Sequence, residues 1–367
     1  MVKQKQQIES IYFLRLFAMM MVVLVHVTAA FGSVLPFGGE AYQKYHFINR
    51  VIRIEAGIFI VITGLVFFYS YIHKPLTKTL WKNYYLKRVT YILVPYIIWA
   101  LIYEGYSIYV GAREFNAIEI MTRILQGKSY YQLHFIFLIV QIYLVLPIFV
   151  WLAQKITFFR KYMWLFGVVL QLLYLMVNGI YHLVPFTLFI SSLATFLLGG
   201  WLGIHYHEQK AKKYNRSTVG LLLLTVVSGT AVSVLHYYVY MIKTISLSGM
   251  VYEIVNTLYL VVGSYFFFRF TEILAERLSR RAVATVKNIA MYSFGFYLVH
   301  PLVLNFVREV IPLHGNYLFH VEIIVQYVMT LGGCYLIIWI CHRFLPFSNL
   351  LFGKLPKKAV FLYNREI

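Results

Sequence analysis

Two ionisable residues, Arg15 and His26, lie within the first long apolar stretch of the chain. On a helix their spacing amounts to three turns plus about 20°, so both side chains would share one face, about 16 Å apart along the axis. Ionisable side chains inside an apolar span are costly and usually mark function. A histidine there can take the proton of a hydroxyl group as that group attacks an acyl carbon. The structural alternative has Arg15 reaching the membrane interface and His26 packing through a hydrogen bond.

The stretch that carries these residues is one of about ten long apolar runs. The chain has 367 residues, of which 61% are hydrophobic and 13% are charged, whereas a soluble domain carries about 25% charged residues. Runs of this length can cross about 30 Å of hydrocarbon, and only helices satisfy the backbone of such a run within lipid. We therefore expect an all-α, polytopic transmembrane bundle that forms a single domain over residues 1–367. The expected spans are 11–33, 52–72, 89–110, 131–153, 163–181, 186–205, 218–240, 250–268, 288–307 and 321–342.

The basic residues are distributed unevenly around these spans. With the N-terminus inside, 24 of the 33 Lys and Arg residues fall in inner segments and 7 in outer ones. This pattern predicts that both termini are cytoplasmic. The net charge of +20 is thereby explained by orientation in a membrane, and we expect no nucleic-acid partner.

The composition also excludes several kinds of chemistry. All 13 acidic residues are glutamates, so Asp-x-Asp metal sites are absent, and neither of the common glycine-rich phosphate-binding motifs occurs. The two cysteines, Cys334 and Cys341, lie about 10 Å apart on the last span and are expected to be apolar core residues. We expect no metal and no permanently bound cofactor.

The pattern of Arg15, ten intervening residues and His26 resembles the hallmark of the membrane-bound acyltransferase family 3. Other segments resemble the same family in order, over nearly the whole chain: 59–65, 88–96, 131–135 and 293–302. Gln132 and His134 stand where many members have histidine and tryptophan, and Ile139 stands where some have glutamate. These departures resemble a Gram-positive branch that includes the proposed O-succinyltransferase of the poly-N-acetylglucosamine intercellular adhesin cluster.

The resemblance implies an enzyme of the bacterial plasma membrane that moves an acyl group from cytoplasmic acyl-CoA to a hydroxyl of an exported polysaccharide. His26 would be the general base, and Arg15, on the same helix face, is the second catalytic candidate and could also meet the donor phosphates. Basic groups at the inner face suit the phosphates of CoA, and Arg88 and Lys87 are the donor-binding candidates. The expected partners are acyl-CoA, a glycan acceptor and the lipid bilayer, with a polysaccharide synthase complex as a further candidate.

Three other residues inside spans are candidates for acceptor binding or support. His300 precedes Pro301 and is expected either in the active cavity or at a structural helix kink. Glu104, near the outer end of the third span, could orient His26 or an acceptor. His134, in the outer half of the fourth span, could line an acceptor cleft. For each of these the alternative is a structural role.

The rival interpretation is a membrane exporter of a glycan, whose charged residues would line a path through the bundle. Against it, the sequence has no paired Gly/Pro-interrupted spans in corresponding halves. The sequence does not distinguish an acetyl from a succinyl donor.

Overall fold

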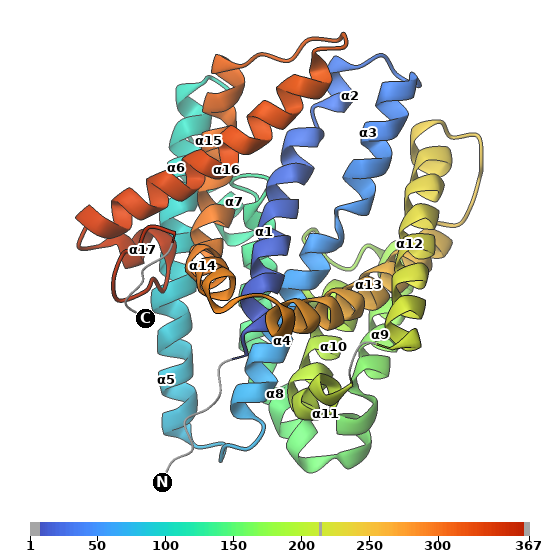
Figure 1. The fold of residues 1–367 in the computed structure, drawn as a ribbon, viewed down its shortest axis with the longest axis vertical. Helices are drawn as coiled ribbons and strands as arrows, with labels where there is room; N and C mark the ends of the chain where they lie inside the picture. The colour runs from blue at the N-terminus through green and yellow to red at the C-terminus, as the bar shows by residue number, and fades with distance from the viewer. Residues whose placement is uncertain (1–7, 213–214, 363–367) are drawn as a thin grey trace.

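The fold is all-helical throughout the described residues, which are 8–212 and 215–362 of a computed structural model (Figure 1). The α-helices are α1 (Ser10–Thr28), α2 (Phe31–Val34), α3 (Glu40–Val51), α4 (Ile54–Tyr71), α5 (Lys78–Arg88), α6 (Val94–Tyr109), α7 (Ala117–Leu125), α8 (Leu133–Lys155), α9 (Thr157–Tyr181), α10 (Leu193–Ile204), α11 (Tyr206–Ala211), α12 (Arg216–His236), α13 (Gly249–Arg277), α14 (Arg280–Ala290), α15 (Ser293–Val310), α16 (Phe319–Phe344) and α17 (Ser348–Phe352). Two π-helices, η1 (Val89–Leu93) and η3 (Tyr237–Met241), and one 3₁₀ helix, η2 (Phe189–Ser192), complete the set.

Eight helical stretches in the described chain are long and apolar enough to cross a membrane: Ser10–Val34, Glu40–Tyr71, Lys78–Tyr109, Leu133–Lys155, Thr157–Tyr181, Arg216–Met241, Gly249–Arg277 and Phe319–Phe344. A ninth is the pair α14 and α15, which meet at a bend of 59°. The remaining expected span, 186–205, is a shorter apolar helix, Phe189–Ile204. The multi-pass helical bundle is therefore confirmed, with eight or nine full spans where we expected about ten. The orientation of the termini stays a prediction.

The third span is longer than the sequence suggested. The basic segment α5 continues through the π-helix η1 into α6 as one stretch, Lys78–Tyr109. Pro95 lies in the first turn of α6 and cannot donate a backbone hydrogen bond. A widened turn just before it places Arg88 on the same continuous helical stretch as the outer part of the span.

Helix α1 occupies the middle of the bundle (Figure 1). It packs against α4, α13, α14, α15 and α16, and more than half of its residues are buried. A side chain on α1 therefore faces other helices rather than lipid in most directions. This central position explains why α1 can carry both Arg15 and His26.

The tightest helix contact joins α4 to α10 and depends on glycine. A Cβ atom at Gly64 would lie 2.3 Å from the carbonyl oxygen of Phe196. Gly199 and Gly203 form a Gly-x-x-x-Gly pair, and a Cβ at Gly199 would lie 2.2 Å from the Val61 oxygen. Small residues at this spacing let two membrane helices approach closely. This contact fixes α4, which carries part of the site described next.

Candidate active site

The imidazole of His26 lies against two other rings in the bundle. Its centroid is 5.2 Å from that of His300 on α15, in a stacked arrangement, and 4.5 Å from that of Tyr131 at the start of α8. His26 itself is only half-buried. Neither of its ring nitrogens has a hydrogen-bond partner in the described part of the protein. His26 therefore presents two free nitrogens beside the rings of His300 and Tyr131.

His300 is fully buried and is held by its own helix. Its Nδ1 lies 3.0 Å from the backbone oxygen of Phe296. A carbonyl oxygen only accepts, so Nδ1 carries the hydrogen and Nε2 carries the lone pair. This Nε2 is buried without a partner among the described residues. The structure thus brings His300 to His26 and also gives it a hydrogen bond within its own helix, while its role stays a prediction.

Further polar groups in this region lack partners within the described chain. Gln132 is 1% exposed, and neither its side-chain nitrogen nor its oxygen is hydrogen-bonded. Glu55 is buried with a free Oε2, and the Nε of Arg308 is also free. Arg308 donates from Nη2 to the backbone oxygen of His26, at 2.9 Å. Buried polar groups are normally hydrogen-bonded, so such a concentration indicates a place for water or a polar ligand.

Arg15 and Arg88 converge at the predicted cytoplasmic end of the bundle. The guanidinium of Arg88 lies over the rings of Phe67, Tyr84 and Tyr143, with centroid distances of 5.0, 4.7 and 5.0 Å. Tyr143 also lies within electrostatic range of Arg15. Neither arginine forms an ion pair within the described residues. Lys87, by contrast, is exposed and points away from this pair because successive helical residues diverge by about 100°.

A narrow gap runs along α1 between these two ends. It is lined by Met19, Val22 and Val23 of α1, Phe59 of α4, and Ser293, Phe296, Tyr297 and His300 of α15. Its empty volume is about 160 Å³, and it is too narrow for a water molecule. The gap reaches His300, and on α1 it begins at Met19, one turn beyond Arg15.

Glu104 is brought to a different partner from the one expected. Its buried carboxylate pairs with Arg123 at 2.8 Å and with Arg113 at 3.0 Å. The hydrogen bond to Glu104 raises the pKa of Arg123, so this pair stays ionised. Arg113 also donates to the backbone oxygen of Ser129, at 2.9 Å. Glu104 thus anchors the segment that leads to Tyr131, and no contact joins it to the His26 ring among the described residues.

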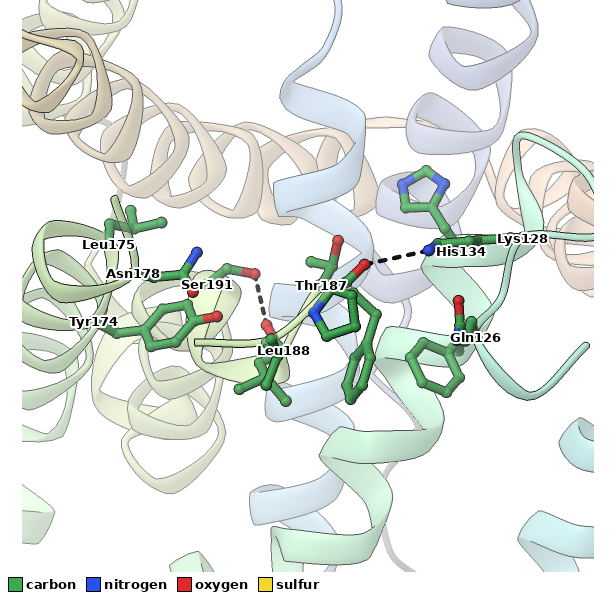
Figure 2. Close-up of a pocket in the computed structure, with 13 residues that line it drawn as sticks. Gln126, Lys128, His134, Tyr174, Leu175, Asn178, Thr187, Leu188 and Ser191 are labelled. Atoms are coloured by element: carbon green, nitrogen blue, oxygen red, sulfur yellow. Dashed lines mark hydrogen bonds between the residues drawn. The ribbon is translucent and has the colours of Figure 1, made fainter. Parts of the chain in front are cut away.

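His134 lines an open cleft of about 390 Å³ beside α8 and α9 (Figure 2). It is exposed, and its Nδ1 lies 2.6 Å from the backbone oxygen of Tyr131. His134 is therefore linked to His26 through Tyr131.

Sequence reasoning did not single out Tyr131, Gln132, Glu55 or Arg308 as site residues. Arg308 directly follows the expected span 288–307, and Glu55 lies near the start of the expected span 52–72. Ionisable residues at the ends of spans are the sequence signal that points to both. Tyr131 reaches His26 through a long-range contact that no local pattern reveals.

Residues 8–339 match the acyltransferase domain of the acyltransferase 3 family, and the chain belongs to this family. The chain is also similar to the "Probable poly-beta-1,6-N-acetyl-D-glucosamine export protein" of Staphylococcus aureus strains MSSA476, MW2 and N315. In each case the identity is 24% over 281 residues, which is 73% of either chain. No solved structure matches the chain significantly. Family and fold together define a multi-pass membrane acyltransferase.

Proposed function

We propose that this protein transfers an acyl group from cytoplasmic acyl-CoA to a hydroxyl of an exported glycan. The observation that carries the proposal is the site around His26. A half-buried imidazole with two free nitrogens stacks on His300, whose Nε2 is also free, inside a chain of the acyltransferase 3 family. A helix face with an arginine at one end and this pair at the other suits a reaction whose donor and acceptor arrive from opposite sides.

The donor is supported by the arginines at the predicted cytoplasmic end. Arg15 and Arg88 have no carboxylate partner in the described chain, and the guanidinium of Arg88 lies over the rings of Tyr84 and Tyr143. Phosphates of CoA would satisfy both guanidinium groups with charge-assisted bonds. Lys87 lies in the exposed rim and would act only through long-range attraction. Acyl-CoA acts as a co-substrate in this scheme, and no cofactor is retained.

Donor binding requires the gap beside α1 to widen. The thioester arm would run past Met19 and Val22 towards the histidines, with its acyl carbon near His26. Because the gap is closed, α15 must shift relative to α1 before the arm can enter. The 59° bend between α14 and α15 offers a hinge for such a movement.

His26 acts as general base in the transfer. It accepts the proton of the acceptor hydroxyl while the hydroxyl oxygen attacks the thioester carbonyl. The resulting tetrahedral species collapses with loss of the CoA thiolate, which takes the proton back from the imidazolium. The products are a glycan ester and free CoA.

The acceptor in this proposal is a poly-N-acetylglucosamine-type glycan. The staphylococcal relatives are named for the export of poly-beta-1,6-N-acetyl-D-glucosamine, which supports a glycan of that class. The partners of the enzyme would thus be the bilayer, the glycan and the polysaccharide synthase from which the glycan emerges. Either an acetyl or a succinyl group fits the reaction.

Export of the glycan is the second candidate, because the staphylococcal relatives are named for it. The two functions differ in what they change outside the cell. Analysis of ester groups on surface glycan, with and without this protein, separates them. An acyltransferase changes the ester content at constant glycan amount, whereas an exporter changes the amount of glycan outside. Loss of glycan with unchanged ester content per sugar would overturn the proposal.

A further inference from the structure

The cleft that His134 lines lies where α8, α9 and the chain between α9 and α10 meet. Figure 2 shows Tyr174 and Asn178 of α9 on one side, Gln126 and His134 on the other, and Thr187 to Ser191 between them. Its volume of about 390 Å³ falls in the range of small-molecule sites. The cleft is at the predicted outer end of both helices, which is the side from which the acceptor would arrive.

The walls of the cleft are held by side-chain bonds to the backbone. Gln141 of α8 donates to the oxygen of Thr187 at 2.9 Å and accepts from the nitrogen of Phe189 at 3.1 Å. His182 has a left-handed backbone, with φ of 46°, and reverses the chain after α9. Asn178 then accepts from the nitrogen of Leu183 at 3.1 Å. These bonds tie the segment between α9 and η2, which forms one wall of the cleft, to both helices.

Several groups in the cleft are available to a ligand. The side chains of Gln126, Tyr174 and Thr187 have no hydrogen-bond partner in the described part of the chain. Phe137 and Phe186 pack edge to face beside them, with centroids 5.8 Å apart. A sugar ring has hydroxyl groups at its edge and apolar C–H faces, so amide, hydroxyl and aromatic groups together match its chemistry.

The charge of the cleft would distinguish sugars with free amines from sugars whose amines are acetylated. Lys128 is its one ammonium group and donates to the oxygen of Pro185 at 3.2 Å, the bond drawn across the cleft in Figure 2. None of the residues that line the cleft is acidic. A glycan that carries free amines would bring positive charges next to Lys128 with no carboxylate to pair them. A sugar whose amines are acetylated brings no such charge.

We propose that this cleft binds the acceptor glycan and selects N-acetylated over de-N-acetylated hexosamine units. The inference rests on the proposed function and deepens it by naming the acceptor's place and its acetylation state. His134 connects the cleft to the reaction site, because its bond to Tyr131 lies next to the Tyr131 ring that touches His26. A glycan held here would have a neighbouring sugar at the histidine pair.

The test uses the full chain in lipid nanodiscs without acyl-CoA. The probes are β-1,6-linked oligosaccharides of N-acetylglucosamine and of glucosamine, and binding is measured by titration calorimetry. The wild-type protein should prefer the acetylated probe. Tyr174→Ala should weaken that binding about tenfold, the effect of losing an aromatic face and a hydrogen bond. Tyr181→Ala, on the same helix but outside the cleft, is the matched control and should bind as wild type.

A charge change tests the selectivity. Lys128→Gln removes the charge and keeps a donor for Pro185, and Lys128→Glu reverses the charge. The preference for the acetylated probe should be lower in Lys128→Gln than in the wild type and lowest in Lys128→Glu, where it should fall by about fivefold. Equal binding of both probes to the wild type, or no effect of Tyr174→Ala and Lys128→Glu, would overturn the inference. Acyl transfer that persists in that case would leave the proposed function standing. Intact binding by a protein that transfers no acyl group would instead refute only the proposed function.

Discussion

Arg88 and Lys87 are adjacent in the sequence, yet the fold separates them. Arg88 is surrounded by three aromatic rings near Arg15, while Lys87 is exposed. The sequence predicted that both would bind the donor, because their position at the inner face was visible but the side of the helix was not. Their difference gives a test at the scale of single residues.

Arg88→Ala should raise the KM for acyl-CoA about tenfold or more, because a charge-assisted phosphate contact is lost. The KM for the glycan acceptor should stay nearly unchanged. Lys87→Ala is the control and should alter either constant by less than about threefold. Steady-state kinetics with each substrate varied in turn would measure both. A change confined to the acceptor KM would refute the assignment of Arg88 to the donor.

The histidine pair illustrates what the sequence could reveal and what it could not. The spacing of Arg15 and His26 predicts one shared helix face, and His300 is one of the candidates for the active cavity. The structure stacks His300 on His26, while the roles of these residues stay predictions. The expected link from Glu104 to His26 is not seen, because Glu104 pairs with Arg113 and Arg123 instead. These two arginines reach Glu104 through tertiary packing, which the sequence pattern does not reveal.

Among the elements, the contact of α4 with α10 is the least tolerant. Gly199→Ala places a methyl group 2.2 Å from the Val61 oxygen, so the two helices must move apart. Overpacking of this kind costs about 1–3 kcal/mol. Gly220→Ala on α12 meets no atom within 4 Å and should be neutral or slightly stabilising. Thermal unfolding in detergent should show a lower Tm for Gly199→Ala only, and equal Tm values would contradict the close packing.

The helices also show how much of the fold the apolar patterns predict. Eight of the ten expected spans coincide with long apolar helical stretches, because runs of this length can only be helical in lipid. The expected span 186–205 covers a shorter helix, and 288–307 crosses the bend between α14 and α15. The bend between α14 and α15 and the π-turn before Pro95 were not predicted. Both are departures from a regular helix that are caused by packing or by proline. Neither changes the apolar composition of the segment, so hydropathy does not reveal them.

For the whole molecule, the distribution of basic residues predicts the orientation in the membrane. With 24 basic residues on one side and 7 on the other, both termini should face the cytoplasm. A cysteine-reactive or protease-cleavable tag after residue 367 should be protected in intact cells and accessible in inverted vesicles. Accessibility from outside alone would invert the topology and with it the donor side of the site.

A second prediction for the whole molecule is that acyl transfer needs no metal. The described chain brings no three His, Cys, Asp or Glu side chains together as a metal site. Acyl transfer by the purified protein should therefore be unchanged, within about twofold, after treatment with EDTA. Loss of activity on chelation, with recovery on adding zinc or another divalent ion, would require a different mechanism.

The central claim is that His26 accepts the proton of the acceptor hydroxyl, and one comparison tests it most directly. Acyl transfer is measured in nanodiscs for the wild-type protein and for His26→Gln, together with acyl-CoA binding and Tm. Glutamine keeps hydrogen-bonding capacity but accepts no proton at neutral pH. The account predicts transfer at least ~10²-fold slower with donor binding and Tm unchanged. Near-normal transfer by His26→Gln would contradict it and would move the role of base to His300.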